Sequence, residues 1–132
     1  MPKDAAYYAA ERRIEKALRW GDKTLDLDIV GAPENEKLTE LPDSIGELTQ
    51  LQSLNLSGNN LTTLPNSLGK LTQLKSLNIA NNQLINLPDS LGQLTQLTSL
   101  ELSRNQLTTL PDSLGQLTQL TSLDLSNNKL TT

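Results

Sequence analysis

Four acidic residues are the first candidates for chemistry, because they fall at related positions of a repeated pattern. Glu101 and Asp124 lie 23 residues apart in the segments SLELS and SLDLS, and Asp26 and Asp28 lie in the similar segment TLDLD. Paired carboxylates can catalyse glycoside hydrolysis or coordinate calcium. On neighbouring strands, residues 101 and 124 would lie about 5 Å apart at the backbone. No aromatic residues or oxygen-rich loops accompany them, so we interpret them as a solvated acidic row.

Other catalytic and metal-binding arrangements are excluded by composition. The 132 residues contain neither cysteine nor histidine, which removes disulfides, thiolate or imidazole zinc ligands, and catalytic sites that need either side chain. Neither GxxxxGK[ST] nor GxSxG occurs in the chain. The formal net charge of −4 argues against nucleic acid, whose binding proteins need a basic surface. We therefore expect no enzyme activity, no cofactor and no metal.

The elements that position these residues follow from a strict period. Four prolines recur every 23 residues, and four copies of the frame LxxLxLxxNxL recur with the same spacing. A fixed period in the twenties indicates a stack of similar turns. The asparagines of the frame are Asn59, Asn82, Asn105 and Asn128.

This frame, together with its second half LPxSLGxLTQL, resembles the leucine-rich repeat from Leu25 onward. It is similar to the 23-residue type found in bacterial and Ras-group-related intracellular proteins. The resemblance implies an α/β solenoid with a concave parallel β-sheet and short 3₁₀ or helical turns on the convex side. It also implies protein partners in general, without naming one.

The physical reading of one turn agrees with this resemblance. In a strand, Leu54 and Leu56 point inward and Asn55 points outward. The repeated asparagine amide can satisfy backbone groups of its own turn and of the next turn. Leu68 and Leu71 are expected to point back to the core. The repeated glycines, such as Gly69, are expected to end each convex turn in the left-handed conformation.

The N-terminal segment breaks the pattern and predicts a helix. Asp4 is a suitable N-cap and Gly21 a suitable stop, while Tyr7, Ala10, Ile14 and Leu18 follow helical spacing. We expect residues 1–21 to form an amphipathic helix that caps the repeat domain, residues 22–132. A helix lying on a membrane surface is the rival interpretation. The first turn carries a six-residue insertion that contains Gly31 and Pro33.

Protein binding is expected on the outward strand positions, which form the concave face of a solenoid. These positions carry small polar side chains and some charges. Only Arg104 belongs to the residue types that dominate binding energies. The candidate protein-binding residues are Asp26, Asp28, Ser53, Asn55, Ser76, Asn78, Ser99, Glu101, Arg104, Ser122 and Asp124.

A second surface is expected at the end of the last turn. After Thr132 the Leu-Pro of a further convex segment does not follow, so one side of the last leucines would be open. Either the chain is a piece of a longer or engineered protein, or the open end pairs with a second copy. Both explanations predict tail-to-tail self-association of this chain through Leu120, Leu123, Leu125 and Leu130.

We therefore predict a non-enzymatic protein–protein interaction scaffold that forms homo-oligomers through its C-terminal end. One alternative is a self-assembling structural solenoid, and another is the sensing segment of a larger bacterial GTPase or effector. The charged first residues lack the apolar run of a signal peptide, and no apolar stretch is long enough to span a membrane. A cytoplasmic location is the expectation.

Overall fold

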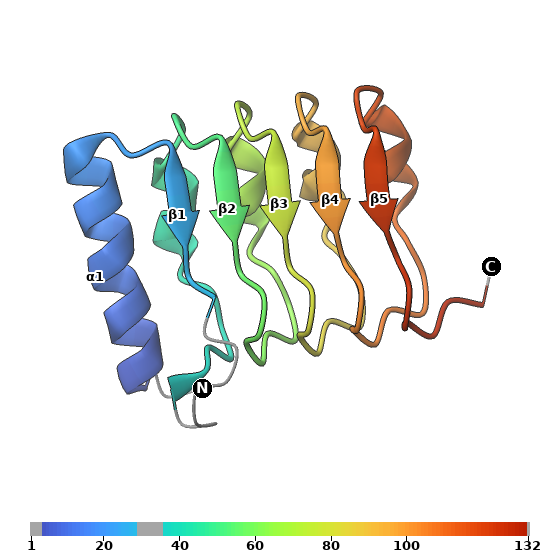
Figure 1. Ribbon diagram of the computed structural model, residues 1–132, viewed down its shortest axis with the longest axis horizontal. Helices are drawn as coiled ribbons and strands as arrows, with labels where there is room; N and C mark the ends of the chain where they lie inside the picture. The colour runs from blue at the N-terminus through green and yellow to red at the C-terminus, as the bar shows by residue number, and fades with distance from the viewer. Residues whose placement is uncertain (1–3, 29–35, 132) are drawn as a thin grey trace.

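A parallel β-sheet of five very short strands forms one face of the molecule (Figure 1). The computed structural model describes residues 4–28 and 36–131. The strands follow one another across the sheet in chain order. They are β1 (Thr24–Asp26), β2 (Ser53–Asn55), β3 (Ser76–Asn78), β4 (Ser99–Glu101) and β5 (Ser122–Asp124).

In the described part of the chain, four 3₁₀ helices form a second layer behind the sheet, and one α-helix lies at its end beside β1 (Figure 1). Each 3₁₀ helix follows a proline, whose fixed φ and missing amide suit the start of a helical turn. The α-helix is α1 (Ala5–Trp20), and the 3₁₀ helices are η2 (Asp43–Glu47), η3 (Asn66–Lys70), η4 (Asp89–Gln93) and η5 (Asp112–Gln116). The predicted α/β solenoid is therefore confirmed.

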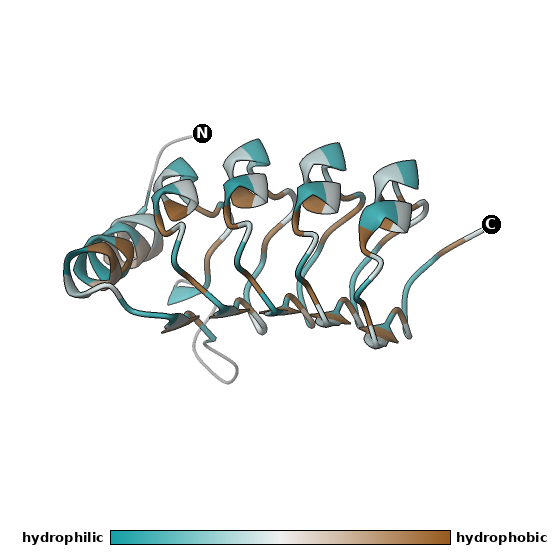
Figure 2. Cartoon of the chain, turned by 90° about the horizontal axis from the view of Figure 1, so that it is seen from above, coloured by the Kyte–Doolittle hydropathy of each residue, from teal (hydrophilic) through white to brown (hydrophobic). Residues whose placement is uncertain are grey.

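The register of the sheet places identical positions of successive repeats side by side. Leu54 pairs with Leu77, and Leu77 with Leu100, so the middle residue of every strand forms one inward column. Leu68 and Leu71, from the convex side, are fully buried, as the sequence predicts. Hydrophobic residues line the space between the two layers in Figure 2. Because each turn buries its leucines only against its neighbours, stacking is the source of the core.

The convex glycines serve close packing, and the predicted left-handed stop is wrong. Among the glycines of the described residues, positive φ angles occur only at Gly21 and Gly58. A Cβ atom added at Gly69 would lie 2.7 Å from the Ser90 carbonyl oxygen, and one at Gly92 would lie 2.5 Å from that of Ser113. Each of these glycines therefore lets the next 3₁₀ helix approach its backbone.

The helix α1 covers the first turn of the solenoid. Asp4 Oδ1 accepts a hydrogen bond from the Tyr7 amide at 3.0 Å, and Gly21 ends the helix with φ 65°, so both predicted caps are confirmed. The expected apolar face needs one correction, because Leu18 is exposed and Ala17 is buried in its place. The buried face consists of Ala6, Tyr7, Ala10, Ile14 and Ala17.

Three of the five residues on this face are alanines, whereas the larger Leu18 is exposed. The Arg13 guanidinium also ties α1 to the sheet by donating to the Asp26 carbonyl. Gly31 and Pro33 of the predicted insertion lie outside the described residues. Within the part of the chain that is described, no helix has the length and apolarity to cross a membrane.

Candidate functional site

The repeated asparagines shape the point where each strand leaves the sheet. Asn105 is buried, and its Nδ2 donates to the carbonyls of Leu102 at 3.0 Å and of Ile79 at 3.0 Å. Its Oδ1 accepts from the Leu84 amide at 3.1 Å. Leu102 belongs to the same turn, whereas Ile79 and Leu84 belong to the preceding one. The prediction of a link between turns is therefore right, but the link runs to the preceding turn and not to the next.

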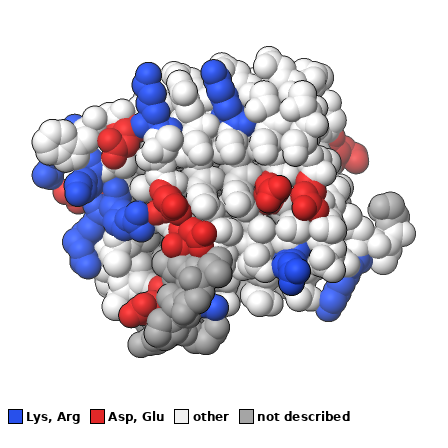
Figure 3. Space-filling model, in the orientation of Figure 1, with Lys and Arg blue, Asp and Glu red and all other residues white. Residues whose placement is uncertain are grey.

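The outward residues of the strands form the candidate binding row, which runs across all five strands. The register aligns Asp26 with Asn55, Asn55 with Asn78, Asn78 with Glu101, and Glu101 with Asp124. Neighbouring members lie about 4.8 Å apart, the usual spacing of strands. Figure 3, which faces this side of the sheet, shows acidic groups toward both ends of the row and none in between.

Short side chains in this row are held in place by the backbone two residues further on. Asn55 Oδ1 accepts from the Ser57 amide at 3.0 Å, and Asp26 Oδ1 accepts from the Asp28 amide at 2.9 Å. These local bonds restrict the rotamer and leave the second polar atom of each side chain for other partners. The row therefore offers amide donors at Asn55 and Asn78 between carboxylates at its two ends.

The serines of the candidate set lie two residues before this row, at the start of each strand. Ser53 and Ser76 pair with each other across β2 and β3, and Ser99 pairs with Ser122 across β4 and β5. All four are at least partly exposed. The structure thus brings the predicted outward residues together on one face, where their side chains are small.

Among the acidic residues that the structure describes, Asp124 is the one with a clearly shifted pKa. The Ser126 hydroxyl, at 2.6 Å, and the Ser126 amide, at 2.9 Å, both donate to Asp124 Oδ1. These two hydrogen bonds lower the pKa of Asp124 below its usual value of 3.8. The ionised form is favoured, which suits an acceptor of hydrogen bonds better than a donor of protons.

Arg104 lies beside the row in an unusual backbone conformation. Its φ is 59°, and the equivalent positions are held by Gly58, Asn81 and Asn127, also with positive φ. Glycine and asparagine adopt this left-handed region readily, whereas arginine does so at a cost of about 1 kcal/mol. The exposed Arg104 is therefore a chemical exception on this face.

The β5 edge, formed by the last turn, is open. The amides of Leu102 and Arg104 donate to carbonyls of the following turn at 2.9 and 3.0 Å. The corresponding amides of Leu125 and Asn127 donate to no other described residue. Leu123 is 46% exposed, although the equivalent Leu100 is fully buried. The other predicted members of this surface are partly buried against the core, namely Leu120, Leu125 and Leu130.

On the convex side of the same turn, the space beside Gly115 is not filled by any described residue. A Cβ atom added at Gly92 would clash with Ser113, whereas one at Gly115 would meet nothing within 4 Å. The sequence DSLGQ is identical in η4 and η5. The edge is thus shaped on both layers to receive one more turn of the same kind.

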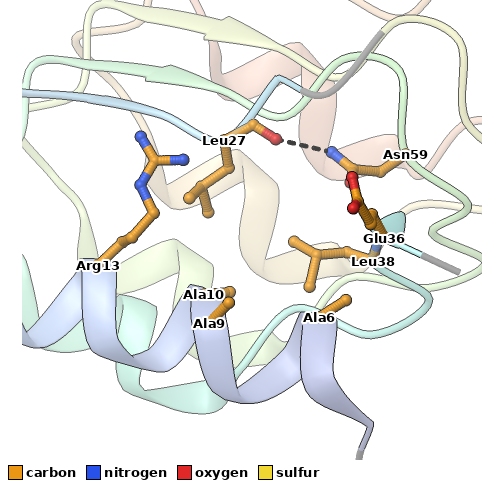
Figure 4. A pocket seen from close by; sticks show the side chains of 8 residues that line it. All are labelled: Ala6, Ala9, Ala10, Arg13, Leu27, Glu36, Leu38 and Asn59. Carbon is orange, nitrogen blue, oxygen red and sulfur yellow. Dashed lines mark hydrogen bonds between the residues drawn. The ribbon is translucent and has the colours of Figure 1, made fainter. Parts of the chain in front are cut away.

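A small pocket lies between α1 and the first turn (Figure 4). Its volume is about 80 Å³, and alanines of the helix form much of its wall. The Leu27 carbonyl at its rim is already bonded to Asn59 Nδ2 at 3.1 Å. Among the described residues, no group of three acidic, histidine or cysteine side chains is arranged to hold a metal ion.

Sequence reasoning missed one group of residues that the fold brings together. The outward face of α1, defined as Tyr8, Arg12, Glu15, Lys16, Arg19 and Trp20, is exposed. The signal was present, because all three aromatic residues of the chain precede residue 21. Their absence from the repeats explains the leucine core but also means that the helix holds every large aromatic contact residue.

Comparisons with known proteins agree with this architecture. The model of the leucine-rich repeat region matches residues 25–132. A leucine-rich repeat protein of Leptospira interrogans is 34% identical with a TM-score of 0.69, and the match covers 98% of this chain and 36% of that one. The leucine-rich repeat domain of a Shigella effector is 29% identical with a TM-score of 0.77, covering 100% of this chain and 52% of that one.

An internalin of Listeria monocytogenes is 37% identical with a TM-score of 0.62, and the match covers 73% of this chain and 28% of that one. The chain therefore spans between about a quarter and a half of the matched structures. No curated protein sequence matches it. Leucine-rich repeat domains generally bind proteins. The stacked turns, the asparagine ladder (the hydrogen-bonded column of Asn59, Asn82, Asn105 and Asn128) and the family match together place this chain in the leucine-rich repeat family.

Proposed function

We propose that this chain is a non-enzymatic module for protein–protein interaction. The outward sheet face would contact the partner, and the β5 edge would join two copies of the 132-residue chain. The observation that carries the first part is the aligned row from Asp26 to Asp124. It offers ordered hydrogen-bonding groups on a rigid sheet while every leucine of the interior strands β2–β4 points inward.

The residues proposed to contact a protein partner are those of the candidate set, with Arg104 as the most distinctive member. The row supplies amide donors flanked by carboxylates, so it suits a partner segment that carries both polar and basic groups. Polar contacts of this kind give specificity more readily than affinity. A moderate affinity is therefore the expectation for this face.

The proposal of self-association rests on the open state of the last turn. Half-buried leucines and backbone amides without a described acceptor favour pairing of edge strands. Restoring burial at Leu123 alone would contribute up to about 1 kcal/mol per copy, taking half of a full leucine burial. The backbone groups of two β5 edges would add directional hydrogen bonds.

The mass of the chain as a function of concentration tests this association. The chain of 14.4 kDa is expected to approach twice its mass at high micromolar concentration in light scattering coupled to size exclusion. Leu123→Ser should keep it monomeric. The matched change Ile85→Ser, at another exposed apolar residue, should leave the association intact. A monomer at high micromolar concentration would rule out the proposed pairing.

A version with a polar capping turn appended after Thr132 separates the two roles. If the chain is an interaction module, the capped version should lose self-association but still capture a protein partner in a pull-down. In the capped chain, Asn78→Lys on the outward face should abolish this capture, whereas Asp89→Lys on the convex face should not. Strong self-assembly without any other captured protein would instead favour a structural solenoid whose main partner is itself.

A second candidate function is that of a sensing segment in a larger bacterial protein. The short coverage of the matched structures supports it, and one of these is the repeat domain of a Shigella effector. A bacterial origin and a cytoplasmic location belong to the same proposal. The bacterial sources of the matched structures support the first, and the absence of cysteine is compatible with the second.

A further inference from the structure

The residue types that dominate protein interfaces gather on α1 and not on the sheet. Hot spots of binding are enriched in tryptophan, tyrosine and arginine. Trp20 is 71% exposed and Tyr8 is 49% exposed, and Arg12 and Arg19 lie on the same helix. The outward face of the sheet contributes only Arg104 to this class. Tryptophan is highly buried on average in folded proteins, so the exposure of Trp20 departs from that average.

The geometry of the helix groups these residues on the side opposite the core. With 3.6 residues per turn, Tyr8, Arg12, Glu15 and Arg19 fall within a sector of about 60°. This sector lies opposite the buried alanines and Ile14. Trp20 and Lys16 lie together on one flank of it. Tyr8 and Trp20 are about 18 Å apart along the helix axis, which sets the length of the surface.

Tyr8 is held by the core beneath it. Its ring packs edge-on against that of Tyr7, with ring centroids 5.8 Å apart and an interplanar angle of 86°. Tyr7 is itself buried. The aromatic side chain at this end of the surface is therefore preorganised, which reduces the entropy lost on binding.

Unpaired positive charge surrounds Trp20. A shallow hollow of about 300 Å³ is lined by Arg12, Glu15, Lys16, Arg19 and Trp20. Glu15 and Arg19 form an ion pair at 3.3 Å. Arg12 and Lys16 then have no carboxylate partner among the described residues. The hollow thus combines one large apolar ring with two free cations.

The charge of the whole chain is divided along the same line. Residues 1–23 contain six lysines and arginines and four acidic residues, a net charge of +2. Residues 24–132 contain five lysines and arginines and eleven acidic residues, a net charge of −6. Figure 3 shows basic side chains concentrated at the α1 end of the molecule. An approaching acidic partner would therefore be directed to this end.

We propose that the outward face of α1 is a docking surface for an acidic amphipathic segment of a partner protein. An apolar side chain of that segment contacts Trp20, and its carboxylates bind Arg12 and Lys16. This surface is separate from the sheet face and from the β5 edge. An anionic lipid surface fits less well, because charged residues fill the space between Tyr8 and Trp20 and leave no continuous apolar sector to insert.

Trp20 provides the test, because it is the single tryptophan of the chain. The probe is a blocked helical peptide with leucine at every third or fourth position and glutamate elsewhere. Its control is the same peptide with lysine in place of glutamate. Titration of the chain with the acidic peptide should shift the Trp20 emission to shorter wavelength in a saturable way. The affinity should fall when the salt concentration is raised from about 50 to about 500 mM.

Charge-reversal variants link the signal to the named side chains. The double variant Arg12→Glu, Lys16→Glu should bind the acidic peptide about tenfold more weakly. The matched variant Lys70→Glu, Lys75→Glu changes the net charge equally but lies on the repeats, and should bind normally. Circular dichroism and thermal unfolding confirm that both variants fold.

Several outcomes would overturn the proposal. These are the absence of an emission shift with the acidic peptide, an equal shift with the lysine peptide, or equal weakening by both double variants. Vesicles of phosphatidylglycerol are titrated in parallel. Tighter binding to these vesicles than to the peptide would identify a lipid surface as the occupant and reject the protein segment.

Discussion

At the scale of single residues, the asparagine ladder is the most demanding feature of the fold. One side chain makes four hydrogen bonds to three backbone carbonyls and one amide in two turns. Because an unsatisfied buried group keeps its full desolvation cost, an apolar substitute at a buried copy of this position would be strongly destabilising. This requirement, and not ligand binding, explains the asparagine in every repeat.

The last two of the four repeated asparagines, Asn105 and Asn128, differ in a way that tests this explanation. Asn105 is 3% exposed, whereas Asn128 is only partly buried although it makes equivalent bonds. Asn105→Ala should lower the free energy of unfolding by about 2–4 kcal/mol, because it leaves buried carbonyls and an amide without a hydrogen-bond partner. Asn128→Ala should cost about 1 kcal/mol, because water replaces its bonds. Urea denaturation measures both, and equal losses would contradict the role of burial.

A second prediction at this scale concerns Asp124. Its pKa is lowered by the Ser126 hydroxyl and amide, so the folded state favours the charged carboxylate. The stabilisation by this group is therefore fully present above the usual value of 3.8 and is lost as the pH falls through the lowered pKa. Ser126→Ala should raise the pKa of Asp124 toward the usual value. Carbon-detected NMR titration measures it, and an unchanged pKa would refute the hydroxyl's part.

At the scale of elements, the convex glycines show that turns approach one another more closely behind the sheet than side chains would permit. A Cβ atom added at the last of them, Gly115, would meet no described atom within 4 Å. Gly92 and Gly115 thus lie in identical sequences, but only Gly92 has a neighbouring backbone too close for a side chain.

This contrast predicts opposite effects of one substitution. Gly92→Ala places a methyl group against the Ser113 carbonyl and should destabilise the chain by about 1–3 kcal/mol. Gly115→Ala should be neutral or stabilise it by up to about 1 kcal/mol, because alanine restricts the unfolded chain. Thermal unfolding followed by circular dichroism compares them. Similar losses for both would show that the glycine conformation, and not the close approach, decides.

Periodicity revealed the elements of this fold, whereas their contacts needed the structure. The recurrence of leucine and asparagine predicts the strands, the inward columns and the helix at the N-terminus. Periodicity does not distinguish a glycine needed for a left-handed conformation from one needed for the close approach of a neighbouring turn, since either would recur at the same position of the repeat. The burial of Ala17 in place of Leu18 likewise depends on how close α1 lies to the first turn.

The candidate site divides in the same way. The outward row could be assigned from the alternation within each strand, because the pattern repeats five times. The exposed face of α1 occurs once, so no second copy supports its assignment, and the only sequence signal for it is that all aromatic residues precede residue 21. Comparison between repeats is informative only where there are repeats to compare.

At the scale of the whole molecule, the two ends of the stack differ. The first turn packs against α1, whereas the turn of β5 contacts described residues on the β4 side only. Because stability in such a stack is close to a sum over neighbouring turns, it should decline toward β5.

Hydrogen exchange detects this decline in a matched pair of amides. Ser76 donates to Gln52 and Ser122 donates to Thr98, both at 3.1 Å. Ser122 should nevertheless exchange at least about tenfold faster, because the last turn opens without breaking a second interface. The measurement is made at low concentration, where the β5 edges do not pair. Equal protection would indicate that the stack unfolds as a single unit.

The near-identity of the last two repeats also has a consequence for the length of the stack. A turn inserted into the middle of the stack would meet the same contacts on both sides, because the units from Pro88 and Pro111 differ at only three positions. Each gain or loss would move the helical end and the strand end apart or together by about 5 Å. The number of repeats therefore sets the distance between α1 and β5. A duplication in the gene can change this distance in whole-repeat steps without altering either element.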